Sequence, residues 1–338
     1  MIDKKLKSPV VYFGAKSKVS LVVWERFGAV HNFIDPCMGS AAMLLGRPEY
    51  LRTNNDIETI NDKNGFVSNF WRAVKADSAA VADAAYWPVN ENDLHARHAW
   101  LRGKREGLTA VLEGDPEFYD ARIAGWWAWG MSCSIGSKFC NQNQVGPWII
   151  QTENEISLLV DRRIVGGDEI GITKNLPYLG GSHSHKQGIT CADSREELIE
   201  WFKVIEKRLE KVRVASGDWS RVCGPSVTYG HGLTGMFFDP PYNDENCDQG
   251  LYDCNSKISA DIRQYCIENS DNKLMRIALC GYEGEGHDVL VSEHGWSIYE
   301  WKANGGYGNQ RSDGDNVNSR RERIYFSPHC LNNNVNWV

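Results

Sequence analysis

The pattern of apolar and polar positions near the start of the chain alternates between strand and helix. Residues 30–35 form a short apolar run closed by an acid, and a turn of small residues with a short helix ending at Gly46 follows. Five apolar residues then recur at helical spacing: Ile60, Val67, Phe70, Trp71 and Val74. They predict a helix over 57–77, within a βαβ unit whose ligand loop follows its first strand.

The middle of the chain has a different pattern. Residues 76–135 have helical character, and 197–212 form a second amphipathic helix. Between them, residues 136–195 are rich in Gly, Asn, Gln, Ser and His and show weak periodicity. A segment of that length without clear elements is usually functional. We therefore expect an insertion into a sheet domain.

The last third returns to strands. Apolar runs within 212–222, 232–242 and 273–284 predict three of them, and the alternating segments 296–303 and 321–328 predict a closing antiparallel hairpin. The strands of one sheet thus come from both ends of the chain. The predicted catalytic domain comprises 1–75 and 196–338, and the inserted region is 76–195, first helix-rich and then loop-rich.

Composition and charge narrow the class of protein. Of 338 residues, 42% are hydrophobic and 24% charged, which is typical of a soluble globular protein. No run of about 20 apolar residues predicts a membrane span, and no signal peptide is recognised. Ten scattered cysteines without a CxxC pair favour reduced thiols in the cytoplasm and no metal site. A net charge of −7 argues against coating nucleic acid by charge alone.

Residues 239–242 form an acid-proline-proline-aromatic corner after an apolar run. The Asp239 carboxylate and the Pro240 carbonyl are hydrogen-bond acceptors, and the rings of Pro240 and Pro241 fix φ. Tyr242 offers a flat face for stacking. Two acceptors and an aromatic face match the exocyclic amino group of adenine or cytosine, through positioning and electrostatics. The alternative is a proline-terminated strand whose tyrosine belongs to the core.

A second candidate corner closes the first strand. Asp35 ends that strand, and Gly39 and Ser40 allow the backbone to approach a ligand at a helix start. Asp56 follows about 20 residues later, where an acid can hold ribose hydroxyls. Asp35 as a turn residue and Asp56 as a helix cap are the alternatives.

Five short motifs occur in the order found in the N6-adenine DNA methyltransferases of the DNA adenine methylase type, which the chain resembles. The corner 239–242 is that family's catalytic motif without change. The cofactor loop is similar to "FIDPCMGSAAML" and the N-terminal motif to "YFGAKSK", with Tyr12, Ala15 and Cys37 as departures. The ribose-binding stretch is similar to "NNDIETIND", and the turn beside the cofactor adenine to "SGDW".

The resemblance implies S-adenosylmethionine as the cofactor. It assigns the following residues to cofactor binding: Tyr12, Gly14, Lys16, Asp35, Pro36, Gly39, Ser40, Asp56, Asp218, Trp219 and Asp239. It also implies the α/β fold of class I methyltransferases, a Rossmann-like mixed sheet with helices on both faces and a closing antiparallel hairpin. The target adenine flips out of duplex DNA, stacks on Tyr242 and donates its amino hydrogens to Asp239 and Pro240.

The resemblance further implies a target-recognition region in 76–195. Amide side chains suit adenine edges, and histidines and basic residues suit phosphates; solvated loops are the alternative. Candidate DNA contacts are Lys18, Asn141, Gln142, Asn143, His183, His185, Lys186, Arg311, Arg320 and Arg321. Three tryptophans in "GWWAWG" are expected in the core. The expected partner is double-stranded DNA, and no association with a membrane is expected. We expect a monomer or weak dimer.

Three other functions remain open at this stage. An N4-cytosine methyltransferase has the same corner chemistry but more often carries Ser in place of Asp239. Methyltransferases of RNA or of protein glutamine usually carry Asn there. A silent DNA-binding relative keeps the cofactor site without turnover. The outer segments resemble prophage-borne methylases, which points to a bacterium or its virus and to restriction-modification or phage DNA methylation.

Overall fold

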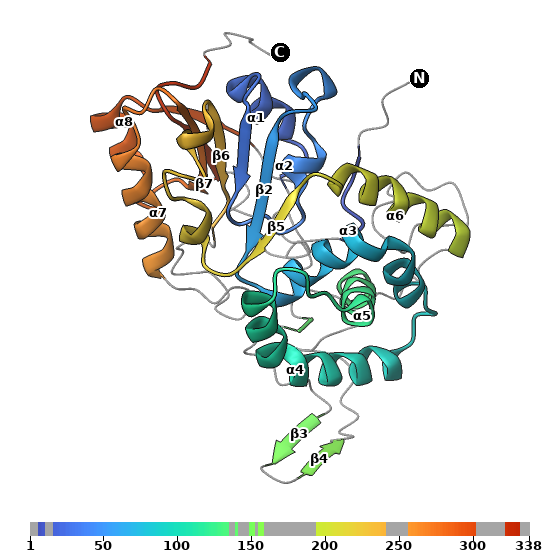
Figure 1. Ribbon diagram of the computed structural model, residues 1–338. Coiled ribbons are helices and arrows are strands. Elements are labelled where there is room, and N and C mark those ends of the chain that lie inside the picture. The colour runs from blue at the N-terminus through green and yellow to red at the C-terminus, as the bar shows by residue number, and fades with distance from the viewer. Residues whose placement is uncertain are drawn as a thin grey trace.

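The strands of the protein form one large sheet and one small one. The computed structural model describes residues 6–10, 16–134, 139–140, 149–152, 155–158, 194–240, 256–301 and 322–331. The large sheet has the order β5-β2-β1-β6-β7-β9-β8 (Figure 1). Its strands are β1 (Asn32–Asp35), β2 (Ile57–Asp62), β5 (Arg213–Ser216), β6 (Thr234–Phe238), β7 (Met275–Tyr282), β8 (Ser297–Glu300) and β9 (Glu322–Phe326).

Strand direction makes this a mixed, mostly parallel sheet. β5, β2, β1, β6 and β7 pair in parallel. β9 lies antiparallel between β7 and β8. The predicted α/β class, the strands split between both ends of the chain and the closing antiparallel hairpin are therefore confirmed.

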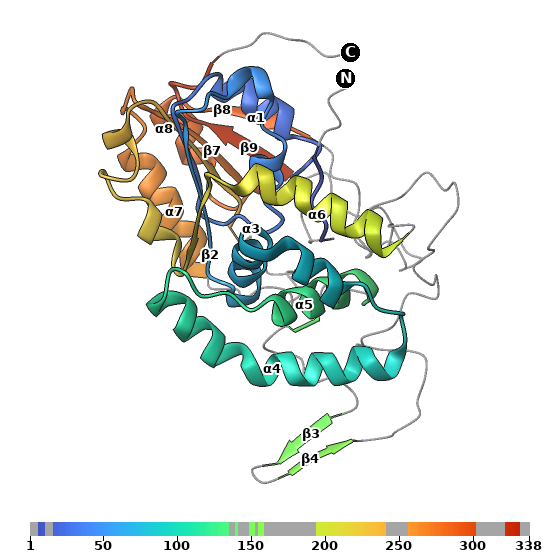
Figure 2. The same ribbon diagram turned by 45° about the vertical axis from the view of Figure 1, so that its right-hand side comes forward.

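Helices cover both faces of the large sheet. They are α1 (Ser20–Phe27), α2 (Ala42–Leu45), α3 (Gly65–Ala85), α4 (Glu91–Gly114), α5 (Ala121–Cys133), α6 (Arg195–Leu209), α7 (Ser256–Glu268) and α8 (Asp288–His294). The described residues also include the short 3₁₀ turns η1 (Glu49–Leu51), η3 (Trp219–Val222) and η4 (Tyr229–His231). Figure 2 shows α7 and α8 on one side of the sheet and α3, α5 and α6 on the other.

The side chains of β6 show how the two layers form. Met236 and Phe238 pack in one buried cluster with Ile262 of α7, whereas Phe237 packs in the other with the α3 helix. Successive side chains of a strand point to opposite faces, and both faces here are apolar. This is the pattern of a parallel sheet buried on both sides.

The predicted helix over 57–77 is wrong in its first part. Residues 57–62 are strand β2, and α3 begins only at Gly65, where the Asn64 side chain accepts a hydrogen bond from the Phe66 N–H. Four consecutive residues of β2 are buried. A strand covered on both faces does not alternate, so Ile60 fell at helical spacing by coincidence.

The predicted start of the inserted region lies inside a helix. The predicted boundary at 75/76 falls within α3, which bends at Asp77, where φ is −154° and the side chain accepts a bond from Ala80 N–H. α4 and α5 confirm helices in residues 76–135. Trp127 and Trp129 are buried, as expected, whereas Trp126 is partly exposed. The pair β3 (Ile149–Thr152) and β4 (Glu155–Leu158) forms a small antiparallel sheet where only loop was expected.

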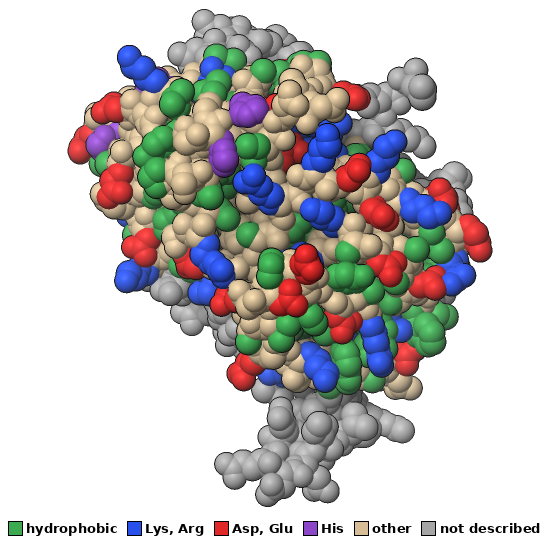
Figure 3. Space-filling model, viewed as in Figure 1, with side chains coloured by type: hydrophobic (Ala, Val, Ile, Leu, Met, Phe, Trp, Pro, Cys, Tyr) green, Lys and Arg blue, Asp and Glu red, His purple; other side chains and the backbone are tan. Residues whose placement is uncertain are grey.

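The surface carries both signs of charge. On the face shown in Figure 3, acidic and basic side chains are interspersed. None of the helices in the described ranges is long and apolar enough to cross a bilayer.

Candidate functional site

Three acids gather at one edge of the large sheet. Asp35 is the last residue of β1, Asp62 is the last residue of β2, and Asp239 directly follows β6. Because these strands are parallel neighbours, their carboxyl ends meet at the same edge. In open α/β sheets this edge is where ligands bind.

The loop after β1 is tied to β2. The Met38 N–H donates to the Asn61 carbonyl at 2.9 Å, and the Asn61 side chain donates to the Pro36 carbonyl at 3.0 Å. Within the loop, the Cys37 N–H donates to the Asp35 carboxylate at 3.3 Å. Gly39 adopts a φ of 44°, a conformation that favours glycine.

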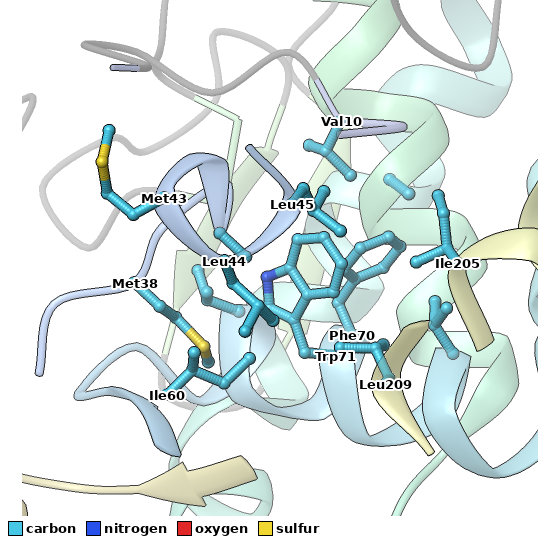
Figure 4. Packing of buried hydrophobic residues seen from close by; sticks show 14 of the residues in the cluster. Val10, Met38, Met43, Leu44, Leu45, Ile60, Phe70, Trp71, Ile205 and Leu209 are labelled. Carbon is cyan, nitrogen blue, oxygen red and sulfur yellow. The ribbon is translucent and has the colours of Figure 1, made fainter. Parts of the chain in front are cut away.

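Trp71 anchors the same loop through a hydrogen bond. The Trp71 indole N–H donates to the Gly39 carbonyl at 2.9 Å, and its ring is buried among apolar side chains of α2, β2 and α6 (Figure 4). Pro36 and Ser40 are buried, whereas Gly39 is only partly covered. The loop therefore presents its backbone at Gly39 while the rest is anchored.

Asp62 is the acid that faces this loop. Its carboxylate accepts the Gly39 N–H at 3.0 Å and the Asn64 N–H at 2.8 Å. Burial raises the pKa of Asp62 to about 6, although these two hydrogen bonds act in the opposite direction. The sequence analysis missed this residue, because the stretch before it, "IETIN", is not an apolar run like the one that Asp35 closes.

The expectation that Asp56 lies at this edge is wrong. Asp56 precedes β2 and so lies at the opposite, amino edge of the sheet. Its carboxylate accepts a hydrogen bond from Arg47 Nη2 at 2.6 Å and from Thr53 N–H at 2.9 Å. Asp56 was assigned from its spacing after Asp35 and from the family resemblance, neither of which shows that β2 places Asp56 at the amino edge and Asp62 at the carboxyl edge.

Asp218 and Trp219 lie on the turn after β5. Asp218 is exposed and caps η3 by accepting the Ser220 N–H at 3.0 Å. The Trp219 ring makes edge contacts with Phe238 and Tyr265, with centroids 6.0 and 5.8 Å apart. The preceding glycine reaches β2, since the Asn61 side chain also donates to the Gly217 carbonyl at 3.0 Å.

Lys16 contacts Asp239 directly. Its Nζ lies 2.9 Å from Asp239 Oδ1 and 3.9 Å from Glu322 Oε2. Burial alone lowers the pKa of Lys16, but the charge of Asp239, followed by smaller contributions from Cys280 and Glu322, raises it above its ordinary value. Burial, and then the charge of Asp239, raises the pKa of Asp35 well above its usual range.

The structure therefore brings Lys16, Asp35 and Asp239 together, with Pro36, Gly39 and Ser40 on the adjoining loop and Pro240 beside Asp239. Lys18 is exposed. Other predicted residues lie outside the described ranges: Tyr12, Gly14, Asn141, Gln142, Asn143, His183, His185, Lys186, Pro241, Tyr242, Arg311, Arg320 and Arg321.

Chemically, this edge offers several acceptors and one ammonium group. Carboxylates whose pKa is raised by burial become ionised more readily when a cation binds beside them. The site therefore suits a ligand that carries positive charge and hydroxyl groups. Within the described residues, no group of three or more His, Cys, Asp or Glu side chains is arranged to hold a metal ion.

Comparison with known proteins does not name a relative. No protein-family model matches the chain, and no curated protein matches it.

Proposed function

We propose that the protein is a class I methyltransferase that transfers a methyl group from S-adenosylmethionine to the N6 amino group of adenine in duplex DNA. The observation that carries the proposal is the position of Asp239 and Pro240 at the end of β6, next to the anchored loop of β1 and the carboxylates of Asp35 and Asp62. The catalytic motif and the cofactor loop of the resembled family thus share one edge of the sheet.

The strand order supports the same proposal. The resemblance implies a mixed sheet with a closing hairpin. The observed sheet is mostly parallel, and its most C-terminal strand, β9, lies antiparallel between β7 and β8. Four of the five motif segments also follow the sheet: β1, β5 and β6 each run into one of them, and β2 lies within the fourth.

The residues of this edge fit the cofactor. S-adenosylmethionine supplies an electrophilic methyl group on a sulfonium, together with a second positive charge on its amino group. Asp35 and Asp62 offer carboxylates, of which Asp62 replaces Asp56 as the ribose-binding candidate. Gly39 and Trp219, on the loops after β1 and β5, are both partly exposed and could contact the cofactor.

In this proposal Asp239 and Pro240 position the target base. The Asp239 carboxylate and the Pro240 carbonyl accept the two hydrogens of the adenine amino group, which directs the nitrogen lone pair toward the methyl group. This requires hydrogen-bond acceptors rather than a strong base. Tyr242 is the proposed stacking partner of the flipped base.

The test is direct identification of the methylated product. Purified protein is incubated with labelled S-adenosylmethionine and duplex DNA of mixed sequence, and the DNA is digested to nucleosides. Label in N6-methyl-2′-deoxyadenosine supports the proposal. Label in N4-methylcytosine replaces the base but keeps the corner chemistry. Label only in RNA or protein, or cofactor binding without any turnover, contradicts DNA methylation.

A matched pair of variants connects the product to the corner. Asp239→Ala is expected to lower the methylation rate by about 100-fold or more, the usual effect of losing a group that stabilises the transition state. Cofactor affinity should change by a few-fold only. Asp271→Ala, an exposed surface acid, is the control. Comparable methyl transfer by Asp239→Ala would refute the catalytic assignment.

A further inference from the structure

Lys16 lies between two carboxylates that come from different strands. Asp239 follows β6, Glu322 opens β9, and both strands are neighbours of β7. Lys16 Nζ is 2.9 Å from the first carboxylate and 3.9 Å from the second. The Lys16 side chain is 3% exposed, whereas the Asp239 side chain is 22% exposed. The Lys16 ammonium group is thus buried, whereas the Asp239 carboxylate that it contacts is partly accessible to a ligand.

Other acidic groups surround the ion pair of Lys16 and Asp239. Asp35 lies close enough for its pKa to be raised by the charge of Asp239. Cys280 of β7 is fully buried beside the pair, and burial raises its thiol pKa well above the usual value, so it stays neutral. Crowded acids in a poorly solvated place favour the protonated form of each other. A protonated carboxyl group loses acceptor capacity and gains a donor.

We propose that Lys16 is a positioning residue that holds Asp239 as an oriented, charged acceptor for the amino group of the target base, and that Glu322 in turn holds Lys16. This inference rests on the proposed function. It differs from the cofactor contact that the sequence resemblance assigns to Lys16. In the structure the Lys16 ammonium lies 2.9 Å from the Asp239 carboxylate and 3.9 Å from that of Glu322.

The two roles predict different kinetics. If Lys16 positions Asp239, Lys16→Met lowers kcat about 100-fold at saturating cofactor, while the Kd for S-adenosylmethionine changes by less than about threefold. Lys16→Arg keeps the charge and restores at least part of kcat. Glu322→Gln is expected to lower kcat by about 10-fold through Lys16. If Lys16 binds cofactor, Lys16→Met raises the Kd and leaves kcat at saturation unchanged, which overturns the inference.

The experiment measures Kd by isothermal titration calorimetry and kcat by methyl transfer to duplex DNA, for each variant. Lys203→Met, at an exposed lysine on α6, is the matched control and should behave as wild type. A double variant, Lys16→Met with Asp239→Asn, should be no slower than Asp239→Asn alone, because the carboxylate that Lys16 orients is already absent from the single variant. Additive losses of the two changes contradict the positioning role.

A second readout separates this inference from the proposed function. Urea unfolding of wild type, Lys16→Met, Asp239→Asn and the double variant gives a coupling between the two side chains without any activity assay. If wild type methylates no substrate, the proposed function fails, and clear coupling still supports the ion pair. Independent, additive effects on stability overturn the pairing even where methylation is observed.

Discussion

Gly39 donates its backbone N–H to the Asp62 carboxylate across 3.0 Å. This bond joins the loop after β1 to the end of β2, and so links the two strand ends that border the proposed cofactor site. It also means that Asp62 has a structural partner before any ligand arrives. A ligand at this edge must therefore bind to a carboxylate that is already oriented.

Asp62→Asn is expected to weaken S-adenosylmethionine binding by about 10- to 100-fold, because hydrogen bonds to a charged group contribute roughly 1.5–3 kcal/mol. Calorimetric titration with the cofactor measures this directly. The matched variant is Asp56→Asn, which lies at the opposite edge and contacts Arg47. Asp56→Asn should reduce stability and leave cofactor affinity close to wild type. The reverse pattern would restore the assignment of Asp56.

Asp62 also gives stability a defined pH dependence. Its folded-state pKa of about 6 lies above the ordinary value of 3.8, so the folded protein holds a proton that the unfolded chain releases. The resulting stabilisation is complete at low pH and is lost as pH rises from about 4 to about 6, by up to about 1.4 kcal/mol per pH unit. Above about pH 6 this contribution is constant.

Asp62→Asn removes that proton linkage. Urea unfolding across pH 4 to 7 should show wild type losing stability relative to Asp62→Asn as pH rises. The free energy of unfolding should fall by up to about 1.4 kcal/mol per pH unit between about pH 4 and 6. Using the difference between the two proteins cancels the titrating groups that Asp62 does not influence. Asp35, whose pKa is raised by burial and also by the charge of Asp62, adds to the difference in the same direction. A difference that is flat with pH, or that grows in favour of wild type, contradicts the prediction.

Glu58 is predicted to be a major contributor to stability. Its carboxylate accepts bonds from Arg47 at 3.0 Å and from Arg208 at 2.6 and 2.8 Å, and all three side chains are nearly inaccessible. Breaking a buried ion pair on one side costs about 3–5 kcal/mol. Glu58→Gln should lower the free energy of unfolding by that amount in denaturant titrations. Glu200→Gln, on the surface of α6, should change it by less than about 1 kcal/mol.

Arg97 is predicted to require a flat guanidinium group. Its side chain is buried among the rings of Trp87, Trp126 and Trp129, with 4.9, 4.7 and 4.4 Å from Cζ to the ring centroids. Burial lowers the pKa of Arg97 to about 10. A lysine is compact and strongly hydrated, so it fills this slot poorly.

Arg97→Lys is therefore expected to cost about 1–3 kcal/mol of folding free energy, from lost stacking and cation–π contacts. Thermal unfolding monitored by tryptophan fluorescence measures the loss and reports on the same rings. Arg195→Lys, at an exposed arginine of α6, serves as the control. Equal midpoints for the two variants would show that charge alone is needed at position 97.

The sequence predicted the sheet and the acids that follow clear strands. Asp35 and Asp239 each close a short apolar run, and a strand end is readable from a run that stops at a charge. β2 was mistaken for helix because four of its residues are buried and no alternation is visible. Without that strand, nothing in the sequence indicated that Asp56 and Asp62 lie at opposite edges of the sheet.

The partners of Lys16 could not be read from the sequence. Nothing in a linear pattern states that residue 16 lies against residues 239 and 322, because those contacts depend on which strands become neighbours in the sheet. In the sequence, Glu322 is one acidic residue within a basic stretch, and nothing marks it as a partner of Lys16. Its place beside Lys16 follows only from β9 pairing with β7.

The strand order also sets when this edge can form during synthesis. β1 and β2 are made early, yet their outer neighbours β6 and β5 appear only after residue 213, and β9 later still. On the ribosome, β1 and β2 therefore lack their outer neighbouring strands, and their edge backbone groups remain unpaired, while residues 76–195 are translated. Such high contact order slows folding and exposes nascent chains to aggregation. We expect nascent chains that end before residue 322 to be protease-sensitive at β1 and β2 and to engage chaperones.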